Sequence, residues 1–504
     1  MLVVRAVEDQ PSRGIRRGDV FRIYLVDAHH HMGREGSHRN TPPGAYSYYA
    51  LLWFELRRMA KDQLEKDSLL FEPIRVEPPS LPWKCFSLRD SWERMNNGWL
   101  VDRTIVFPYS DDYAKSSDRT TASFRLSNDK IAGWTTHAPN STRLIGFARV
   151  DPTDGKTKSP DAAVNELNRA VNNLGLRGLK LHPLAQLFVD DIQDDITKRV
   201  VVRAGELRIP VIFDTRNIRT ARKIKALVDD IRSDDSYADA LRGMRIILGH
   251  SAMSPGDSLL HEIIRDPLIH AETSGLHGQD IPVLFKTAQE RVGTTRGSWS
   301  EKILFGTDYS FLSMQAAEVI LYLLSKSFSG TLADIQRILG GNALSLVQKP
   351  FTTDGPSGEA PRQVVFNDED HRGLETLESL ILNLVRNRQW DVASFDFMIP
   401  PRGTWPDVRP HPTGGFSGVY DNSYIITLVA NKGAREVHIW VRQQSGKTST
   451  CAIVGSRAQH TLDTTELAFQ RVDPFLLSTL AEHSVQIESA DRIQSVLLRL
   501  LEVP

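Results

Sequence analysis

Cysteine, long apolar runs and an excess of charge of either sign are all scarce in this 504-residue chain. The two cysteines, Cys85 and Cys451, lie far apart in sequence, which argues against a disulfide framework and excludes a structural zinc site built on thiolates. Residues 1–20 alternate charged and apolar side chains, unlike a signal peptide, and no apolar run is long enough to span a membrane. We therefore expect a cytoplasmic protein.

The charges nearly cancel, with 61 basic against 62 acidic residues and a formal net charge of -1. No overall field draws such a chain to nucleic acid or to a membrane surface, so we expect neither partner. A charged small-molecule substrate would have to be recognised by a local group of side chains. The length exceeds what one ordinary core supports and indicates two or more domains.

Eight short apolar runs alternate with helix-length amphipathic segments between residues 22 and 349. This alternation is typical of β-α-β units that build a parallel sheet. The runs are 23–28, 103–108, 144–150, 178–182, 210–214, 244–249, 268–273 and 303–307. Eight strands in series favour an α/β fold with a closed (β/α)8 TIM barrel over an open doubly wound sheet.

A histidine cluster, Asp27-Ala28-His29-His30-His31, directly follows the apolar run 21–26. Residues two apart on a strand point to the same face, so His29 and His31 are expected to lie side by side. At the end of a barrel strand both rings would project into the barrel mouth, where two neutral imidazoles can hold one divalent metal. The alternative is a chance cluster of histidines on a surface loop, because short motifs often occur without function.

Composition divides the chain into two predicted domains joined by a linker. Residues 1–349 would form the barrel, with a long insertion after its first strand, at 34–100, that contains a helix at 48–66. Residues 350–363 are rich in proline, glycine and serine, as expected of a linker. Residues 364–504 indicate a smaller α+β domain of unknown role, with helices at 374–385 and from Asp473 and strands at 424–430, 437–441 and 450–454.

Six short motifs follow one another along the predicted barrel. They are VDAHHHMG at 26–33, GFARVDP at 146–152, GLKLHP at 178–183, ILGH at 247–250, ILFGTDY at 303–309 and GGNAL at 340–344. In this order they resemble the amidohydrolase-related branch of the metal-dependent amidohydrolase superfamily, which includes the aminocarboxymuconate semialdehyde decarboxylase type. The resemblance extends over residues 22–349.

The resemblance implies a divalent metal held by His29 and His31, by a side chain of the fifth strand and by Asp308 of the eighth. Zinc is the first expectation for this cofactor and manganese the alternative. The resemblance also implies two catalytic residues, Asp308 and His250. A carboxylate can take a proton from metal-activated water, and an imidazole can stabilise or protonate the developing oxyanion.

The fifth strand departs from the family pattern, because Asp214 stands where the family has a histidine. As a ligand, an aspartate adds negative charge and harder oxygen character, which widens the choice of metal from zinc to manganese. Alternatively, Asp214 hydrogen-bonds a histidine that ligates the metal.

Four further side chains near the strand ends are candidates for substrate binding. Lys180 and His182 share one face of the fourth strand, Arg149 ends the third, and Arg216 follows Asp214. Cations suit an anionic substrate, and arginine in particular binds carboxylate or phosphate through two hydrogen bonds. In related two-metal barrels the strand-4 lysine is carboxylated and bridges two ions, which is an alternative role for Lys180, and rim arginines also serve as plain surface ion pairs.

Three functions follow as hypotheses. The first is a metal-dependent hydrolase whose metal-activated water attacks an amide, ester or lactone of a small, anionic substrate. The second is a metal-dependent nonoxidative decarboxylase of a small carboxylic acid. The third is a catalytically weakened barrel that acts as a scaffold or regulatory subunit, with its C-terminal domain binding a second copy or another protein.

Overall fold

A computed structural model describes fifteen segments of the chain. These are residues 2–23, 25–35, 38–40, 44–74, 100–101, 103–109, 124–135, 144–293, 299–309, 313–347, 365–366, 390–397, 424–430, 435–444 and 447–456. The predicted linker at 350–363 and the predicted helices at 374–385 and from Asp473 lie outside the described residues. Within them, no helix is both long enough and apolar enough to cross a bilayer.

Eight parallel strands form the main body, and each overlaps one of the eight predicted apolar runs, although the first run, 23–28, shares only residues 26–28 with its strand. They are β3 (Val26–Glu35), β6 (Arg103–Pro108), β7 continued by β8 (Leu144–Gly146 and Ala148–Arg149), β9 (Leu179–Leu181), β10 (Pro210–Phe213), β11 (Arg245–Leu248), β12 (Ile269–Glu272) and β13 (Ile303–Leu304). Each strand pairs with the next one along the chain. Barrel strands are buried on both faces, as every residue of β6 and β10 shows, which explains why they read as nearly continuous apolar runs.

The sheet closes on itself where the last strand meets the first. The amide of Ala28 donates to the carbonyl of Phe305, and the amide of Asp308 donates to the carbonyl of His29, each at 2.9 Å. The amide of His31 donates to the carbonyl of Tyr309, also at 2.9 Å. These bonds close an eight-stranded barrel, and the predicted (β/α)8 architecture is confirmed.

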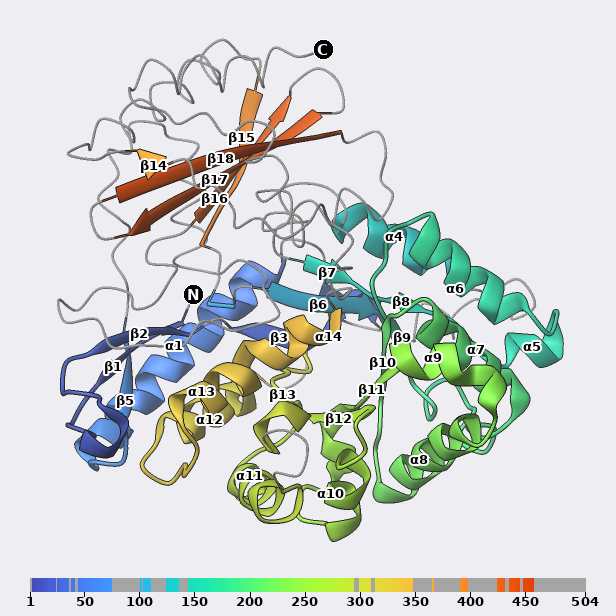
Figure 1. The fold of residues 1–504 in the computed structure, drawn as a ribbon, viewed down its shortest axis with the longest axis horizontal. Helices are drawn as coiled ribbons and strands as arrows, with labels where there is room; N and C mark the ends of the chain where they lie inside the picture. The colour runs from blue at the N-terminus through green and yellow to red at the C-terminus, as the bar shows by residue number, and fades with distance from the viewer. Residues whose placement is uncertain are drawn as a thin grey trace.

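Helices follow the strands in chain order, and Figure 1 shows α6 to α11 lying outside them. The longer ones are α4 (Arg125–Thr135), α6 (Ala162–Asn172), α7 (Asp195–Glu206), α8 (Ile218–Arg232), α10 (Ser258–Ile264), α11 (Asp280–Arg291) and α12 (Ser313–Leu324). The shorter ones are α5 (Asp154–Thr157), α9 (Ala238–Gly243), α13 (Leu332–Gln336) and α14 (Asn342–Val347). In α8 the apolar stripe Ile224, Leu227, Val228 and Ile231 is fully buried, so the helix is fixed by its amphipathic face.

The barrel interior has its own apolar core. Side chains from most strands and from α14 form one cluster, separate from the core between strands and helices: Val26, Ala28, Ile105, Phe107, Ile145, Phe147, Ile212, Ile247, Leu304, Ala343, Leu346 and Val347. Because side chains alternate along a strand, the residue two positions after an interior one also faces inward. Ile212 therefore predicts an inward Asp214, which lies at the carboxyl end of β10 where barrel enzymes place their chemistry.

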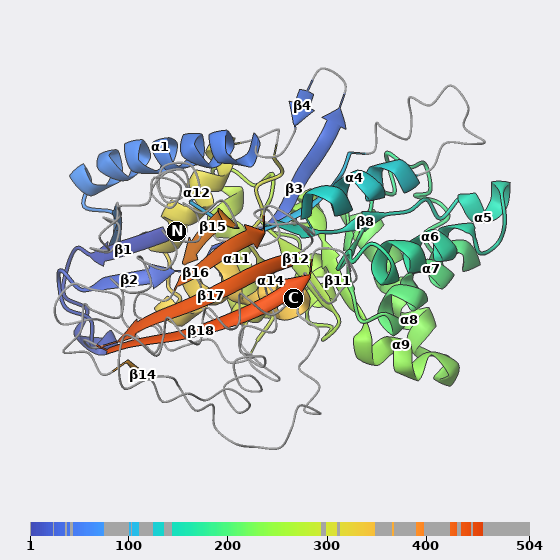
Figure 2. The same cartoon turned by 90° about the horizontal axis from the view of Figure 1, so that it is seen from above.

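Segments before and after the first barrel strand form a three-stranded antiparallel sheet, which the sequence patterns did not predict. Its order is β2 (Val20–Ile23), β1 (Leu2–Ala6) and β5 (Phe71–Ile74). The first barrel strand continues into a hairpin with β4 (His38–Asn40), and α1 (Gly44–Glu65) matches the helix predicted in the insertion. This helix packs against β5 and α12, and Figure 2 shows it running alongside β1.

The C-terminal part contains a five-stranded antiparallel sheet. Its order is β14 (Val365–Phe366), β18 (Lys447–Ser456), β17 (Arg435–Gln444), β16 (Tyr424–Ala430) and β15 (Trp390–Phe397). Three of these strands cover the three strands predicted from the sequence. The division into domains and the role of the C-terminal part stay predictions.

Candidate active site

Three side chains from the two strands that close the barrel converge at its carboxyl end. Asp308 Oδ1 lies 3.3 Å from His31 Nε2 and 3.6 Å from His29 Nε2. One ligand atom from each residue lies within 4.8 Å of the other two, and all three residues are buried. Asp308 itself has a φ of 51°, a left-handed conformation that is uncommon outside glycine and turns its carboxylate toward the histidines.

The charge states of these residues suit a cation. Burial lowers the pKa of His29 well below its ordinary value and that of His31 to about 4, so both rings are neutral near pH 7. Burial would raise the pKa of Asp308, but its contact with His31 and the neighbouring histidines hold it well below the usual range. Within the described residues, Asp308 Oδ1 receives no hydrogen bond although it is buried. Two neutral imidazoles and a carboxylate oxygen that accepts no hydrogen bond within the described residues are suitable ligands for a divalent metal.

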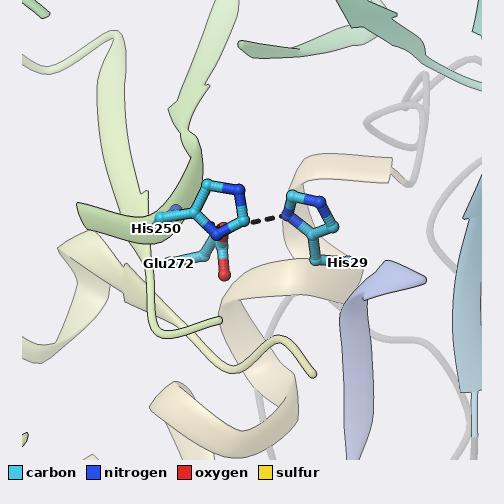
Figure 3. A group of neighbouring side chains, drawn as sticks. All are labelled: His29, His250 and Glu272. Atoms are coloured by element: carbon cyan, nitrogen blue, oxygen red, sulfur yellow. Dashed lines mark hydrogen bonds and ion pairs between the residues drawn. The ribbon is translucent and has the colours of Figure 1, made fainter. Parts of the chain in front are cut away.

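A second group of potential ligands shares His29 but is already engaged in hydrogen bonds. It consists of His29, His250 and Glu272, and Figure 3 shows the Glu272 carboxylate beside both rings. Glu272 Oε1 lies 2.9 Å from His29 Nδ1. A carboxylate oxygen accepts, so His29 carries its proton on Nδ1 and has its lone pair on Nε2, which lies 3.6 Å from Asp308 Oδ1 and 3.0 Å from Lys180 Nζ. The orientation of His29 therefore favours the group with His31 and Asp308.

Sequence reasoning passed over Glu272. It lies next to the end of the predicted run 268–273, and an acidic residue at that end of an apolar run is a signal that could have identified it. Its side chain is fully buried at the end of β12.

His250 lies on a left-handed turn directly after β11. His250, Ser251, Ala252 and Met253 have φ values of 56°, 46°, 56° and 47°. For residues with a Cβ this conformation costs roughly 1–2 kcal/mol each, so surrounding contacts must hold it. The Glu272 side chain accepts from the His250 amide at 2.6 Å, and its carbonyl accepts from Ser251 Oγ at 2.8 Å.

Both ring nitrogens of His250 face acceptors. Nε2 lies 3.2 Å from Asp214 Oδ2, and Nδ1 lies 3.2 Å from the carbonyl of Ser274. Burial opposes a charge on this ring, but Asp214 outweighs it and raises the pKa of His250 above its ordinary value. Geometry and charge therefore agree on a ring protonated at both nitrogens.

Asp214 lies among cations and outside both groups of potential metal ligands. Lys180 Nζ and His250 Nε2 each lie 3.2 Å from its Oδ2, and Arg216 Nε donates to its Oδ1 at 2.7 Å. Burial would raise the pKa of Asp214, but Lys180, His250 and His182 hold it well below its usual range. The structure thus places Asp214 beside the predicted substrate-binding side chains.

The four predicted substrate-binding side chains, of Lys180, His182, Arg149 and Arg216, differ in their surroundings. Lys180 is fully buried, with Nζ 3.0 Å from His29 Nε2, and burial lowers its pKa to about 8. His182 Nε2 lies 3.5 Å from Asp214 Oδ1, and burial lowers its pKa to about 3. Arg149 is fully buried on β8, whereas the Arg216 side chain is 39% exposed and is the only one of the four open to solvent to that degree.

Asp27, the acidic residue of the histidine cluster, joins several elements beneath the site. Its carboxylate accepts from the Thr307 amide and hydroxyl at 3.0 and 2.6 Å and from the His29 amide at 3.1 Å. Tyr49 on α1 donates a further hydrogen bond at 2.9 Å. The first strand, the loop after the eighth strand and the insertion helix are thereby held at one buried carboxylate.

Residues 108–348 match the amidohydrolase family model. This amidohydrolase match begins at the last residue of β6 and extends past α14, so it includes His250, Glu272 and Asp308 but not His29 and His31. The part of the site on the first strand is assigned by its position beside Asp308. No curated protein sequence matches the chain.

Several solved structures resemble this one. A candidate amidohydrolase from Staphylococcus aureus shares 14% identity at a TM-score of 0.40, covering 64% of this chain and 99% of its own. An uncharacterised TIM-barrel protein from Bordetella bronchiseptica shares 14% at 0.39, covering 64% and 98%. 4-Oxalomesaconate hydratase from Rhodopseudomonas palustris shares 15% at 0.37, covering 64% and 95%.

Proposed function

We propose that the barrel is a metal-dependent hydrolase of the amidohydrolase type, acting on an amide, ester or lactone of a small anionic substrate. The observation that carries this proposal is the buried Oδ1 of Asp308, which lies beside two neutral imidazole nitrogens and receives no hydrogen bond within the described residues. A divalent metal bound by His29, His31 and Asp308 would polarise a substrate oxygen and lower the pKa of water.

At the proposed metal site, one residue can accept a proton and another can donate one. Asp308 Oδ2 lies 3.9 Å from His250 Nδ1, so a carboxylate that can accept a proton stands next to an imidazolium that can donate one. His250 carries its charge through the ion pair with Asp214, which keeps the ring protonated above its ordinary pKa. General acid and base are thus available within one site.

An anionic substrate is supported by the cations that accompany Asp214. Lys180 is fully buried beside His29, and the partly exposed Arg216 lies toward solvent. Burying an ammonium is costly unless it is paired, and Asp214 pairs with Lys180 at 3.2 Å. A substrate carboxylate would bind beside these cations and next to the proposed metal.

The second candidate function is metal-dependent decarboxylation. This is the activity of the aminocarboxymuconate semialdehyde decarboxylase type. The same cations favour it, because they would bind the carboxylate that leaves as carbon dioxide. Incubating the protein with carboxylated lactones, esters and amides, and separately with aromatic and unsaturated carboxylic acids, distinguishes the two. Acid production from the first set supports hydrolysis, and carbon dioxide release from the second supports decarboxylation.

Metal content tests the site itself. Protein purified without chelator should contain stoichiometric divalent metal by elemental analysis. The double variant His29→Ala/His31→Ala should lose the metal with little change in far-ultraviolet circular dichroism. His261→Ala is the matched control, because this buried ring bonds the Pro255 carbonyl at 2.7 Å and belongs to neither ligand group. Full metal occupancy in the double variant would refute the proposed site.

A further inference from the structure

The Glu272 carboxylate is surrounded by hydrogen-bond donors. Oε1 accepts from the His250 amide at 2.6 Å, from Ser274 Oγ at 2.6 Å and from His29 Nδ1 at 2.9 Å. Oε2 accepts from the Ser274 amide at 2.5 Å. The side chain is fully buried, so these four donors are what stabilises a carboxylate in that position.

The neighbouring strand leaves room for this arrangement. A Cβ on Gly306 would lie 2.6 Å from Glu272 Oε2 and 3.0 Å from the Cβ of His29, so no larger residue fits between them. Gly306 belongs to the motif ILFGTDY, and its lack of a side chain allows Glu272 to reach across to the first strand.

Glu272 therefore contacts both halves of the site through one oxygen. On one side it fixes the ring of His29, and on the other it holds the backbone of the left-handed turn that carries His250. Ser274 adds to this, because its Oγ lies 2.9 Å from His250 Nδ1 while it donates to Glu272.

We propose that Glu272 is a positioning residue that sets the Nδ1–H tautomer of His29 and holds the His250 turn, and so couples metal binding to proton transfer. The tautomer leaves the lone pair of His29 on Nε2, between Lys180 Nζ at 3.0 Å and Asp308 Oδ1 at 3.6 Å. The part of this inference that concerns metal affinity rests on the proposed function; the tautomer and the turn do not.

Direct ligation of a metal by Glu272 is the alternative reading. It would require Oε1 to give up at least one of three donors, two of which are at 2.6 Å. Because Glu272 Oε1 already accepts three hydrogen bonds, we favour a role in which it orients the ligand histidine His29. Carboxylates beside metal-ligating histidines commonly have this role.

Glu272→Leu is the decisive substitution, because it removes both oxygens and leaves none of the four donors an acceptor at this side chain. Ser274→Ala removes only the hydroxyl between Glu272 and His250. Asp334→Asn is the matched control. Asp334 is a buried carboxylate in the first turn of α13 that accepts from Ser300 Oγ at 2.6 Å and from the Thr331 amide at 2.8 Å.

Imidazole nitrogen chemical shifts of the metal-free protein report the tautomer. We expect His29 to be an Nδ1–H ring in the parent, in Ser274→Ala and in Asp334→Asn, and to lose this signature in Glu272→Leu. Zinc affinity, measured by competition with a chromophoric chelator, should fall about 10- to 100-fold in Glu272→Leu and stay unchanged in the other two variants.

An unchanged His29 signature in Glu272→Leu would overturn the proposal, as would an equal loss of zinc affinity in Asp334→Asn. If Glu272→Leu does not fold, Glu272→Asp replaces it, because the shorter side chain withdraws from His29 and should shift the same signal. A protein that binds no metal but shows the tautomer change would refute the proposed function and leave the positioning role of Glu272 standing.

Discussion

The phenolic oxygen of Tyr49 lies 2.9 Å from Oδ2 of Asp27 and 2.8 Å from Oγ1 of Thr104. Tyr49 is fully buried although it belongs to the long insertion after the first strand. The insertion helix is thus joined to the first two barrel strands directly below the histidines, and its contacts bear on the stability of the site.

Tyr49→Phe should lower the free energy of unfolding by about 1 kcal/mol, because Asp27 keeps its bonds to Thr307 and His29 and loses only one donor. Urea denaturation measures the change. Tyr322→Phe is the control, since that hydroxyl reaches the Ser327 carbonyl at 3.4 Å near the surface. An equal loss in both variants would contradict the role given to Tyr49.

His250→Asn should keep the metal and lose activity by roughly 10²- to 10⁴-fold, the usual contribution of a positioned acid or base. The ring contacts Asp214 and Ser274, neither of which belongs to the proposed ligand set. Elemental analysis and kcat on the best substrate from the panel above provide the test. Loss of metal in this variant would make His250 a ligand.

Asp214→Asn should shift the pH dependence of activity to lower pH. Asp214 raises the pKa of His250, and an acid catalyst is lost as pH rises through that pKa, so the variant should lose activity at a lower pH than the parent. The ion pair between His250 and Asp214 also stabilises the folded protein. This contribution is fully present below the pKa of histidine in the unfolded chain, about 6.5, and is lost as pH rises through the pKa of His250 in the folded protein.

A pH–rate profile, with thermal unfolding measured at two pH values, tests both statements about Asp214. Metal content decides its relation to the metal: occupancy should be retained, because its oxygens contact Lys180, His250 and Arg216. Release of the metal would instead support the sequence-based expectation that Asp214 is a ligand.

Gly306→Ala should weaken metal binding and destabilise the barrel by about 1–3 kcal/mol, the usual cost of overpacking. The added methyl group would clash with Glu272 Oε2 and the Cβ of His29. Gly133→Ala, in α4 with nothing near its missing Cβ, should be neutral or stabilising by about 0.5–1 kcal/mol. Metal affinity that is unchanged in Gly306→Ala would argue against the close approach of Glu272.

The barrel could be predicted because its signals are local. Parallel strands buried on both faces read as apolar runs, and the polar residue after each run, as in His250 and Asp308, marks the end at which side chains gather. The spacing of His29 and His31 predicts a shared face, and their ring centroids lie 5.4 Å apart. Metal binding by these residues stays a prediction.

What the sequence could not provide depends on contacts between distant segments. β1 pairs with β5 nearly seventy residues later, as in the register of Val3 with Ile74, and no local pattern encodes that partner. The surroundings of Asp214 and the reach of Glu272 to His29, 243 positions apart, likewise follow from barrel closure. The sequence allowed polar residues at strand ends to be recognised. It did not show which of these residues contact one another in the folded barrel.

The seam between β3 and the segment after β13 has a consequence for how the protein acquires its site. His29 and His31 come from the first barrel strand and Asp308 from the end of the last, so the group does not exist until the final strand docks and the ring is complete. Asp27 and Thr307, 280 positions apart, meet at the same seam. A nascent or truncated chain that lacks residues 303–309 cannot assemble this group, however well its earlier strands have folded. The integrity of the whole barrel is therefore a precondition of its chemistry.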